Sequence, residues 1–226
     1  MPDPAYVHTA FSSIADKYVA ANHVLSFGAD IQWRARAVQM VAEWKPSRVL
    51  DIATGTGDMA LDIMHALPGV EVLGTDFCEP MLDIARRRGL ANCLQADAMN
   101  LPLADGLFDV ATVAFGLRNM SDYGAALREF RRVLRPGGHL LVLELGIPTG
   151  IVAAPYRLYL HKILPLLATA LSQPRETYAY LGRSIEAFPD RPAFLELLTR
   201  SGYVAPFAVP LFGGIASIYA AERPLE

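Results

Sequence analysis

The chain has 226 residues, of which 53% are hydrophobic and 19% are charged, and its formal net charge is −3. This composition supplies a full hydrophobic core and excludes an intrinsically disordered protein. The slight excess of acidic residues excludes a protein that holds nucleic acid through a global basic field, so no nucleic-acid partner is expected.

The cysteines and the apolar segments indicate a cytoplasmic protein. Cys78 and Cys93 are too few for a disulfide framework or a metal-binding CxxC pair, so we expect reduced thiols and no metal site. Residues 1–5 lack the basic and apolar pattern of a signal peptide. The most apolar stretch, residues 147–172, is interrupted by Pro, Arg, His and Lys, so no membrane-spanning helix is expected.

A helical arm over residues 9–22 and 31–44 is expected first. Strands and helices then alternate over residues 47–145, which predicts a parallel, doubly wound α/β sheet. Its strands are expected at residues 48–52, 70–75, a third ending at 94–96, 108–114 and 139–144, and its helices at residues 57–66, 80–88 and 122–134.

The rest of the chain is expected to be largely helical as far as residue 182, with a further helix near 191–201. Two β-like runs, residues 203–209 and 215–221, predict an antiparallel hairpin on the edge of the sheet. One domain is therefore expected over residues 1–226. Its parts are an arm (1–45), a sheet core (46–146), a helical insertion (147–190) and a C-terminal helix with a hairpin (191–226).

A glycine-rich turn after the first strand carries the strongest local signal. A strand that runs into Gly55 and Gly57 and then into a helix lets the backbone approach a ligand closely, with helix N–H groups exposed. Asp76 follows the second strand, 21 residues after Gly55, where a carboxylate can accept both hydroxyl protons of a ribose. The same glycines with Ala60 fit the loose dinucleotide fingerprint, so an NAD-dependent enzyme is a candidate.

Charge distinguishes between these ligands. The pyrophosphate of a dinucleotide would meet Asp58 at the start of the helix, and two like charges ~4 Å apart repel by about 4 kcal/mol at an effective dielectric of ~20. S-adenosylmethionine has no phosphate and carries sulfonium and ammonium groups, which acids attract. Asp51, Asp76 and Asp97 follow three consecutive strands, which suits one adenosyl ligand across the carboxyl ends of the sheet. We therefore predict S-adenosylmethionine as the cofactor.

Further runs of residues are typical of one enzyme family. They comprise residues 11–18, 22–33, 79–82, 97–102, 113–119, 132–138, 178–181, 184–185 and 188–189, with Asp122 and Glu144. With these runs the chain resembles, over nearly its whole length, the ubiquinone/menaquinone-biosynthesis C-methyltransferases, a branch of the class I S-adenosylmethionine-dependent enzymes. The run VAFGLRN at residues 113–119 is among the most family-specific.

The resemblance implies a Rossmann-like α/β class I methyltransferase fold. Its seven-stranded sheet is mostly parallel with an antiparallel last strand, has helices on both faces, and carries the arm and a helical lid. The resemblance also implies that Thr56, Asp76, Asp97 and Ala98 contact S-adenosylmethionine. The complete cofactor site that we predict comprises Asp51, Gly55, Thr56, Gly57, Asp76, Phe77, Asp97, Ala98 and Ala114.

The family methylates a ring carbon of a polyprenylated quinol. Demethylmenaquinol is the expected acceptor, with the methoxy-benzoquinol of the ubiquinone pathway as the second. Departures from the family pattern at Val19, Asp30, Gly146 and Tyr219 leave two alternatives open. One is a class I methyltransferase for another small aromatic or lipid acceptor. The other is a non-catalytic scaffold of quinone biosynthesis, against which the intact cofactor residues argue.

The catalytic residues expected are Arg118, Asn119 and His161. Arg118 would stabilise the developing phenolate and Asn119 would orient the quinol oxygen, unless Arg118 pairs with an acid such as Asp122. His161 and Tyr159 would act as a base or donor in the lid, or else as interfacial side chains of an amphipathic helix. The acceptor site is expected to comprise Arg118, Asn119, Tyr159 and Tyr178.

Residues 145–174 contain no Asp or Glu but include Arg157, His161 and Lys162 among many apolar residues. This pattern fits a core-packed cap over the sheet. It also fits a lid whose apolar side accepts a prenyl tail and whose basic side rests on anionic lipid. Peripheral contact with the inner face of the membrane through residues 147–172 is therefore expected, and a homodimer is a further candidate.

Overall fold

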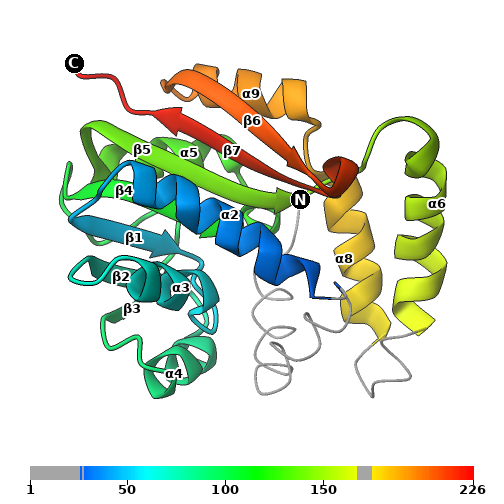
Figure 1. The fold of residues 1–226 in the computed structure, drawn as a ribbon, viewed down its shortest axis with the longest axis horizontal. Coiled ribbons are helices and arrows are strands. Elements are labelled where there is room, and N and C mark those ends of the chain that lie inside the picture. Colours follow the sequence, from blue (N-terminus) through cyan, green and yellow to red (C-terminus); the bar gives the residue numbers. More distant parts are fainter. Residues whose placement is uncertain (1–25, 27, 167–174) are drawn as a thin grey trace.

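The computed structural model describes residue 26, residues 28–166 and residues 175–226, and the side chains of all these except residues 175–178. Seven strands form one sheet in the order β3-β2-β1-β4-β5-β7-β6 (Figure 1). The strands are β1 (Arg48–Ile52), β2 (Glu71–Asp76), β3 (Cys93–Gln95), β4 (Phe108–Ala114), β5 (Leu134–Leu145), β6 (Val204–Leu211) and β7 (Ala216–Glu222). Strands β1 to β5 pair in parallel, and β7 runs antiparallel to both of its neighbours. The predicted fold class and the edge hairpin are confirmed.

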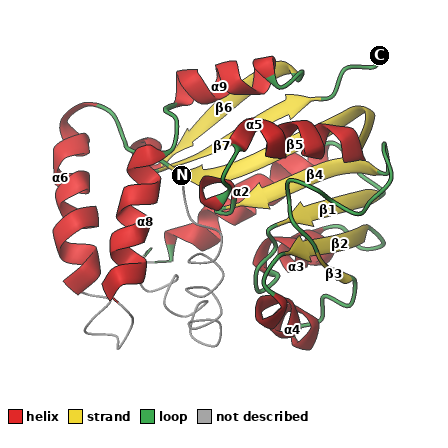
Figure 2. Ribbon diagram, turned by 180° about the vertical axis from the view of Figure 1, so that it is seen from behind, coloured by secondary structure: helices red, strands yellow, loops and turns green. Residues whose placement is uncertain are grey.

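Helices cover both faces of this sheet (Figure 2). The α-helices are α2 (Ala29–Glu43), α3 (Asp58–Ala66), α4 (Glu79–Arg87), α5 (Tyr123–Val133), α6 (Ala153–Leu158), α8 (Arg175–Ala187) and α9 (Arg191–Arg200). Short turns add the 3-10 segments η1 (Leu117–Asn119), η2 (Gly150–Val152) and η4 (Phe212–Gly214), and the π-helical turn η3 (Tyr159–Ile163).

The core lies in two hydrophobic layers, one on each face of the sheet. Because successive residues of a strand point to opposite faces, Val49 packs with α2 and α3 while Leu50 packs with α5 and α9. Burial on both faces explains why the strands are almost continuously apolar in sequence.

The lid elements α6, η3 and α8 stand beyond the carboxyl ends of the parallel strands (Figures 1 and 2). They have a small cluster of their own, in which Leu160, Leu164 and Ile185 are each 2% exposed. None of the described helices is long and apolar enough to cross a membrane.

The largest difference from the predicted elements is the start of β5, at Leu134 instead of residue 139. The intervening turn is hydrogen-bonded to the chain after β7, since Gly137 N–H donates to the carbonyl of Arg223 (3.0 Å) and Arg223 N–H donates to that of Gly138 (2.8 Å). The second helix of the predicted arm is α2. The first, over residues 9–22, lies outside the described residues.

Candidate cofactor and acceptor site

The glycine-rich turn after β1 is held in a conformation that few residues adopt. Ala53 has φ 52°, Gly55 56° and Gly57 86°, all in the left-handed region. Thr54 N–H donates to the carbonyl of Thr75 (2.9 Å), which ties the turn to β2. A Cβ added at Gly55 would meet nothing within 4 Å, so the outer side of this turn is open to a ligand.

Asp51 lies beneath the turn and is 1% exposed. Its carboxylate accepts hydrogen bonds of 2.6 Å from the hydroxyls of both Thr54 and Thr112, the latter opposite it in register on β4. Burial raises the pKa of Asp51 to about 6, the two hydroxyls oppose the rise, and the charge of Asp76 adds to it. Asp51 therefore braces the turn against β4, and its contact with the cofactor stays a prediction.

Asp76, at the end of β2, joins the turn directly. One of its carboxylate oxygens accepts from Gly55 N–H and the other from Cys78 N–H, both at 2.9 Å. The neighbouring hydroxyl of Thr75 is buried and has no hydrogen-bond partner among the described residues. The end of β2 thus offers a carboxylate and a hydroxyl beside an open turn, as a ribose site requires.

The structure does not support the argument that the charge of Asp58 repels the phosphates of a dinucleotide. Asp58 Oδ1 lies 2.9 Å from Nη2 of Arg88, and Oδ2 accepts from the hydroxyl of Thr56 at 2.8 Å. Burial would raise the pKa of Asp58, but hydrogen bonds from Arg88 and Thr56 and the charge of Arg88 lower it. Because Arg88 neutralises this carboxylate, Asp58 does not by itself repel a phosphate.

The end of β3 supplies the third acid. Asp97 is exposed, and its Oδ1 accepts from the backbone N–H of Met99 at 2.9 Å, which makes a tight turn that includes Ala98. Gln95 Nε2 donates to the carbonyl of Phe77 at 3.0 Å, so the segments that follow β2 and β3 lie together. The predicted adenosyl contacts therefore gather along one edge of the sheet.

The turn after β4 closes onto the turn after β1. Phe115 has φ 58°, and the following Gly116 lies so close that an added Cβ would come within 2.6 Å of the Cβ of Ala53. Ala114, the last residue of β4, is half-buried at this junction. Strained backbone and a contact that tolerates only glycine mark this edge as a built site. The residues present at the ends of β1, β2 and β3 fit an adenosyl cofactor.

Arg118 and Glu144 form a buried ion pair at the carboxyl ends of β4 and β5. Their side chains are 6% and 0% exposed, and Nη1 lies 2.7 Å from Oε1. Glu144 also accepts from the backbone N–H of Arg118 (3.2 Å) and of Leu145 (2.9 Å). The acid that pairs with Arg118 is thus Glu144, whereas Asp122 caps α5 by accepting from the N–H of Ala125.

Asn119 lies beside this pair and is reached from the lid. Its Oδ1 accepts from the hydroxyl of Tyr180 on α8 at 3.1 Å, and its Nδ2 lies 3.5 Å from the carbonyl of Phe115. Tyr180 was not among the predicted site residues. Its place in the family-specific run at residues 178–181 was the available signal for it.

The other lid residues contact one another. His161 Nε2 is 3.0 Å from Glu186 Oε1, and Arg157 is 3.6 Å from the same carboxylate. His161 therefore lies between η3 and α8, as in the interfacial alternative, and its role as a base stays a prediction. Tyr159 stacks on Tyr156 with ring centroids 6.3 Å apart. The side chain of Tyr178 lies outside the described residues.

The described departures from the family pattern all have structural contacts. Asp30 accepts from Ser26 (2.5 Å) and from Arg34 (2.8 Å) within a buried network. Tyr219 is 3% exposed and packs edge-on against Phe194. Gly146 N–H donates to the carbonyl of Ile215 at 3.0 Å. These substitutions are accommodated by the fold, and Val19 lies outside the described residues.

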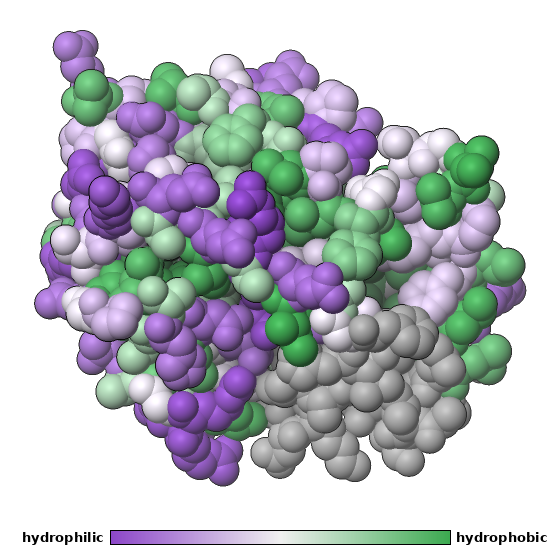
Figure 3. All heavy atoms as spheres, in the orientation of Figure 1, coloured by the Kyte–Doolittle hydropathy of each residue, from purple (hydrophilic) through white to green (hydrophobic). Residues whose placement is uncertain are grey.

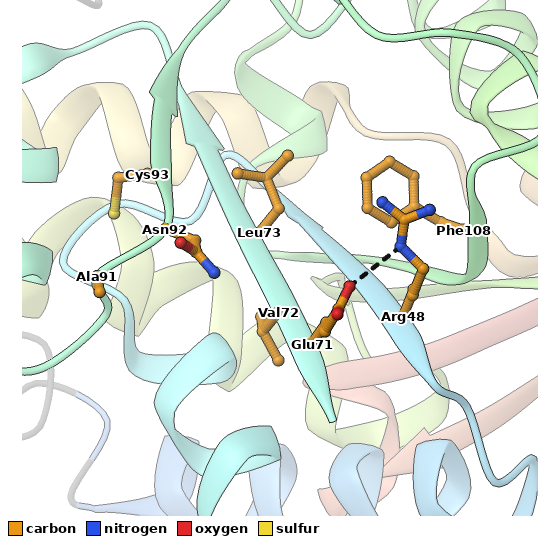
Figure 4. A pocket seen from close by; sticks show the side chains of 8 residues that line it. All are labelled: Arg48, Glu71, Val72, Leu73, Ala91, Asn92, Cys93 and Phe108. Carbon is orange, nitrogen blue, oxygen red and sulfur yellow. Dashed lines mark ion pairs between the residues drawn. The ribbon is translucent and has the colours of Figure 1, made fainter. Parts of the chain in front are cut away.

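A hollow of about 340 Å³ lies at the opposite, amino edge of the sheet (Figure 4). Arg48 spans part of it, 3.3 Å from Glu71 and with its guanidinium 5.5 Å above the ring of Phe108. Ligands of doubly wound sheets bind at the carboxyl ends of the strands, and none of the predicted site residues lines this hollow. The hollow is therefore not the candidate site.

Known proteins agree with this geometry. The model of the ubiE/COQ5 methyltransferase family matches residues 2–223. A demethylmenaquinone methyltransferase of Thermus thermophilus is 47% identical over 220 residues, which are 95% of this chain and 100% of that protein. A ubiquinone/menaquinone biosynthesis C-methyltransferase of Syntrophotalea carbinolica is 43% identical over 221 residues, 95% of this chain and 93% of that one.

Among solved structures, a SAM-dependent methyltransferase from Thermotoga maritima has a TM-score of 0.71 at 20% identity, and the match covers 95% of this chain and 98% of that chain. This likeness shows a shared fold. The predicted enzyme class and the predicted cofactor, S-adenosylmethionine, are confirmed by the family match. The chain belongs to the ubiE/COQ5 methyltransferase family.

Proposed function

We propose that this methyltransferase transfers a methyl group from S-adenosylmethionine to a ring carbon of a polyprenylated quinol, with demethylmenaquinol as the main acceptor. The observation that best supports the proposal is the close approach of Gly116 to Ala53. It brings the turn after β4, which leads to Arg118 and Asn119, next to the glycine-rich turn after β1. The proteins named as demethylmenaquinone methyltransferases, 47% and 39% identical to the chain, support the choice of acceptor.

Positioning is the main contribution of the protein to this reaction. When bound, S-adenosylmethionine supplies an electrophilic methyl group, and we assign its adenosyl part to Gly55, Asp76 and Asp97. An acceptor held in line by the turn after β4 needs little further chemistry, because correct orientation contributes up to ~7–11 kcal/mol in the best intramolecular cases.

The polar residues proposed to contact the acceptor have different roles in the reaction. The amide oxygen of Asn119 orients a ring hydroxyl of the quinol. The Arg118–Glu144 pair has no net charge, so we assign to Arg118 a hydrogen bond to the quinol oxygen, with Glu144 holding the guanidinium in place. The proton of the hydroxyl passes to solvent, and His161, whose Nε2 lies 3.0 Å from Glu186, stays a predicted base for it.

The lid gives the substrate a route from a bilayer. Five large apolar side chains of the lid are exposed: Ile151 (96%), Val152 (49%), Leu158 (58%), Ile163 (44%) and Leu166 (62%). Hydrophobic residues gather along the edge of the molecule where α6 lies (Figure 3). Arg157 and Lys162 are exposed on the same segment and would meet anionic headgroups. We therefore propose that the lid, residues 147–190, docks a cytoplasmic enzyme on the inner face of the membrane.

A methyl-transfer assay with labelled S-adenosylmethionine tests the reaction. Reduced demethylmenaquinone and the demethylated ubiquinone precursor are offered side by side, and we expect transfer to the first to be the faster. Binding of S-adenosylmethionine without transfer to either quinol would point to another acceptor. Absence of binding in a calorimetric titration would favour the scaffold alternative.

Flotation with phosphatidylglycerol-containing vesicles tests the membrane contact. We expect the wild-type protein to float, Leu158→Asp to lose flotation, and Leu225→Asp to keep it, since Leu225 is 77% exposed but outside the lid. Equal flotation of both variants would contradict the docking face. The same samples, in sedimentation without lipid, test whether the chain forms the expected homodimer.

A further inference from the structure

The lid helix α8 is fixed between two other elements. Tyr180 reaches η1 on one side, where its hydroxyl contacts Asn119. On the other side, a Cβ added at Gly182 would lie 3.3 Å from the carbonyl of Leu160 and 3.6 Å from Nδ1 of His161, so α8 packs closely on η3 there. Residues two apart on a helix are separated by about 200°, so these contacts lie on opposite faces of α8.

The orientation of the Asn119 carboxamide follows from its second neighbour. The carbonyl of Phe115 can only accept hydrogen bonds, so the Asn119 nitrogen must face it, at 3.5 Å. The amide oxygen then faces Tyr180, and the tyrosine hydroxyl must donate to it. Phe115 is itself fixed, because its φ of 58° lies in the left-handed region and its N–H donates to the carbonyl of Leu143 at 2.8 Å.

The same carbonyl links Asn119 to the buried ion pair. Arg118 Nη1 donates to the carbonyl of Phe115 and pairs with Glu144 at 2.7 Å. A continuous chain of hydrogen bonds therefore runs from Tyr180 on the lid, through Asn119 and Phe115, to Arg118 and Glu144 at the ends of β4 and β5. The lid therefore contacts the carboxyl ends of β4 and β5 through hydrogen bonds as well as through packing.

We infer that Tyr180 is a positioning residue that sets the Asn119 amide oxygen to select the reduced form of the acceptor. The inference rests on the proposed function. An amide oxygen has two lone pairs; Tyr180 takes one, and no other described residue donates to this oxygen. The second lone pair accepts the ring hydroxyl of a quinol. An oxidised quinone has no hydroxyl to donate, so the oriented oxygen gives it no hydrogen bond.

A double-mutant cycle on Tyr180→Phe and Asn119→Ala tests this coupling, with kcat/KM for methyl transfer to reduced demethylmenaquinone as the readout. Tyr180→Phe in the wild-type background should lower kcat/KM by about 3- to 10-fold, the value of one lost hydrogen bond. In the Asn119→Ala background it should lower kcat/KM by less than about 2-fold, because the oxygen that it orients is absent. Asn119→Ser replaces Asn119→Ala if that variant does not fold.

Tyr203→Phe is the matched control, since it removes another tyrosine hydroxyl, one that donates to the carbonyl of Leu127 on α5 at 3.0 Å and not to η1. It should leave kcat/KM unchanged. Losses that multiply in the double mutant would overturn the inference, because Tyr180 would then act through the packing of α8.

Inhibition by oxidised demethylmenaquinone gives a second readout. If Tyr180 had only a structural role, its loss would weaken the binding of quinol and quinone equally. Tyr180→Phe should raise KM for the quinol by about 3- to 10-fold and leave the inhibition constant of the quinone unchanged. Equal shifts in both constants would overturn the inference and leave the proposed function standing. A wild-type enzyme that methylates no quinol would overturn both together.

Discussion

Asp51 is a residue whose burial has a measurable consequence. The folded protein holds its pKa at about 6, mainly through burial, while a carboxyl in the unfolded chain has a pKa near 3.9. Between these two values the folded state binds more protons than the unfolded state. The contribution of Asp51 to stability is therefore greatest below about pH 4, and it is lost as the pH rises through about 6.

Asp51→Asn removes this titration while keeping a side chain that can bond to Thr54 and Thr112. The free energy of unfolding of the wild type, relative to Asp51→Asn, should fall by about 2 kcal/mol between pH 4 and pH 7. Urea unfolding at a series of pH values measures it. Parallel profiles for the two proteins would show that the pKa of Asp51 is not raised.

Asp76 should matter for the cofactor beyond its part in the fold. Asp76→Asn is expected to weaken S-adenosylmethionine binding about 10- to 100-fold, the value of a hydrogen bond to a charged group. Asp109→Asn is the matched control. Asp109 also holds two backbone N–H groups, those of Ser47 and Arg48, but at the amino edge. Calorimetric titration should find normal binding in Asp109→Asn, and equal losses in both variants would contradict the assignment.

For single residues, the sequence predicted which residue types lie near the site better than which side chains pair with each other. The acids at the carboxyl ends of β1, β2 and β3 lie at one edge, because parallel strands end together. The partner of Arg118 could not be predicted, because Glu144 is 26 residues away and is brought near only by the pairing of β4 with β5. Likewise, Arg88 reaches Asp58 from 30 residues away and cancels a charge that looked unopposed in sequence.

At the scale of secondary-structure elements, the turns after β1 and β4 pack closely together at Ala53 and Gly116. Gly116→Ala would place a Cβ 2.6 Å from that of Ala53, in a backbone with φ −103° that any residue can adopt. The clash should cost about 1–3 kcal/mol of stability and weaken S-adenosylmethionine binding, since Ala53 is part of the cofactor turn.

Gly146→Ala is the control for this substitution. Its nearest neighbour would be the carbonyl of Gly214 at 3.7 Å, an ordinary contact, so stability and binding should change little. Melting temperature and calorimetric titration of the two variants measure both effects. A Gly116→Ala protein that binds the cofactor normally would show that the two turns can separate at no cost to the site.

The elements themselves were largely predictable, because strands buried on both faces read as short apolar runs between glycine- or proline-containing turns. The early start of β5 was not. The segment Pro136–Gly137–Gly138 reads as an open turn, and its hydrogen bonds to Arg223, 86 residues after Gly137, could not be predicted. The contact of the lid with η1 was equally hidden, because Tyr180 and Asn119 are 61 residues apart in sequence.

For the whole molecule, the predicted cofactor site lies across the carboxyl ends of several strands. A ligand that bridges the ends of β1 to β4 stabilises only the folded state. S-adenosylmethionine at 100 times its Kd should add about 2.7 kcal/mol and raise the melting temperature by roughly 5–10 °C. Thermal unfolding at several ligand concentrations checks this. A larger rise with NAD would contradict the cofactor and revive the dinucleotide alternative.

The position of β7 has a consequence for how the protein is made. This strand lies between β5 and β6 in the sheet but leaves the ribosome after both. About 70 residues separate the end of β5 from the start of β7. At 5–20 residues per second, the β5 edge therefore stays unpaired for roughly 4–14 s during synthesis. Unpaired strand edges recruit other chains, so translation speed and chaperone supply should govern the yield of this protein more than its equilibrium stability does.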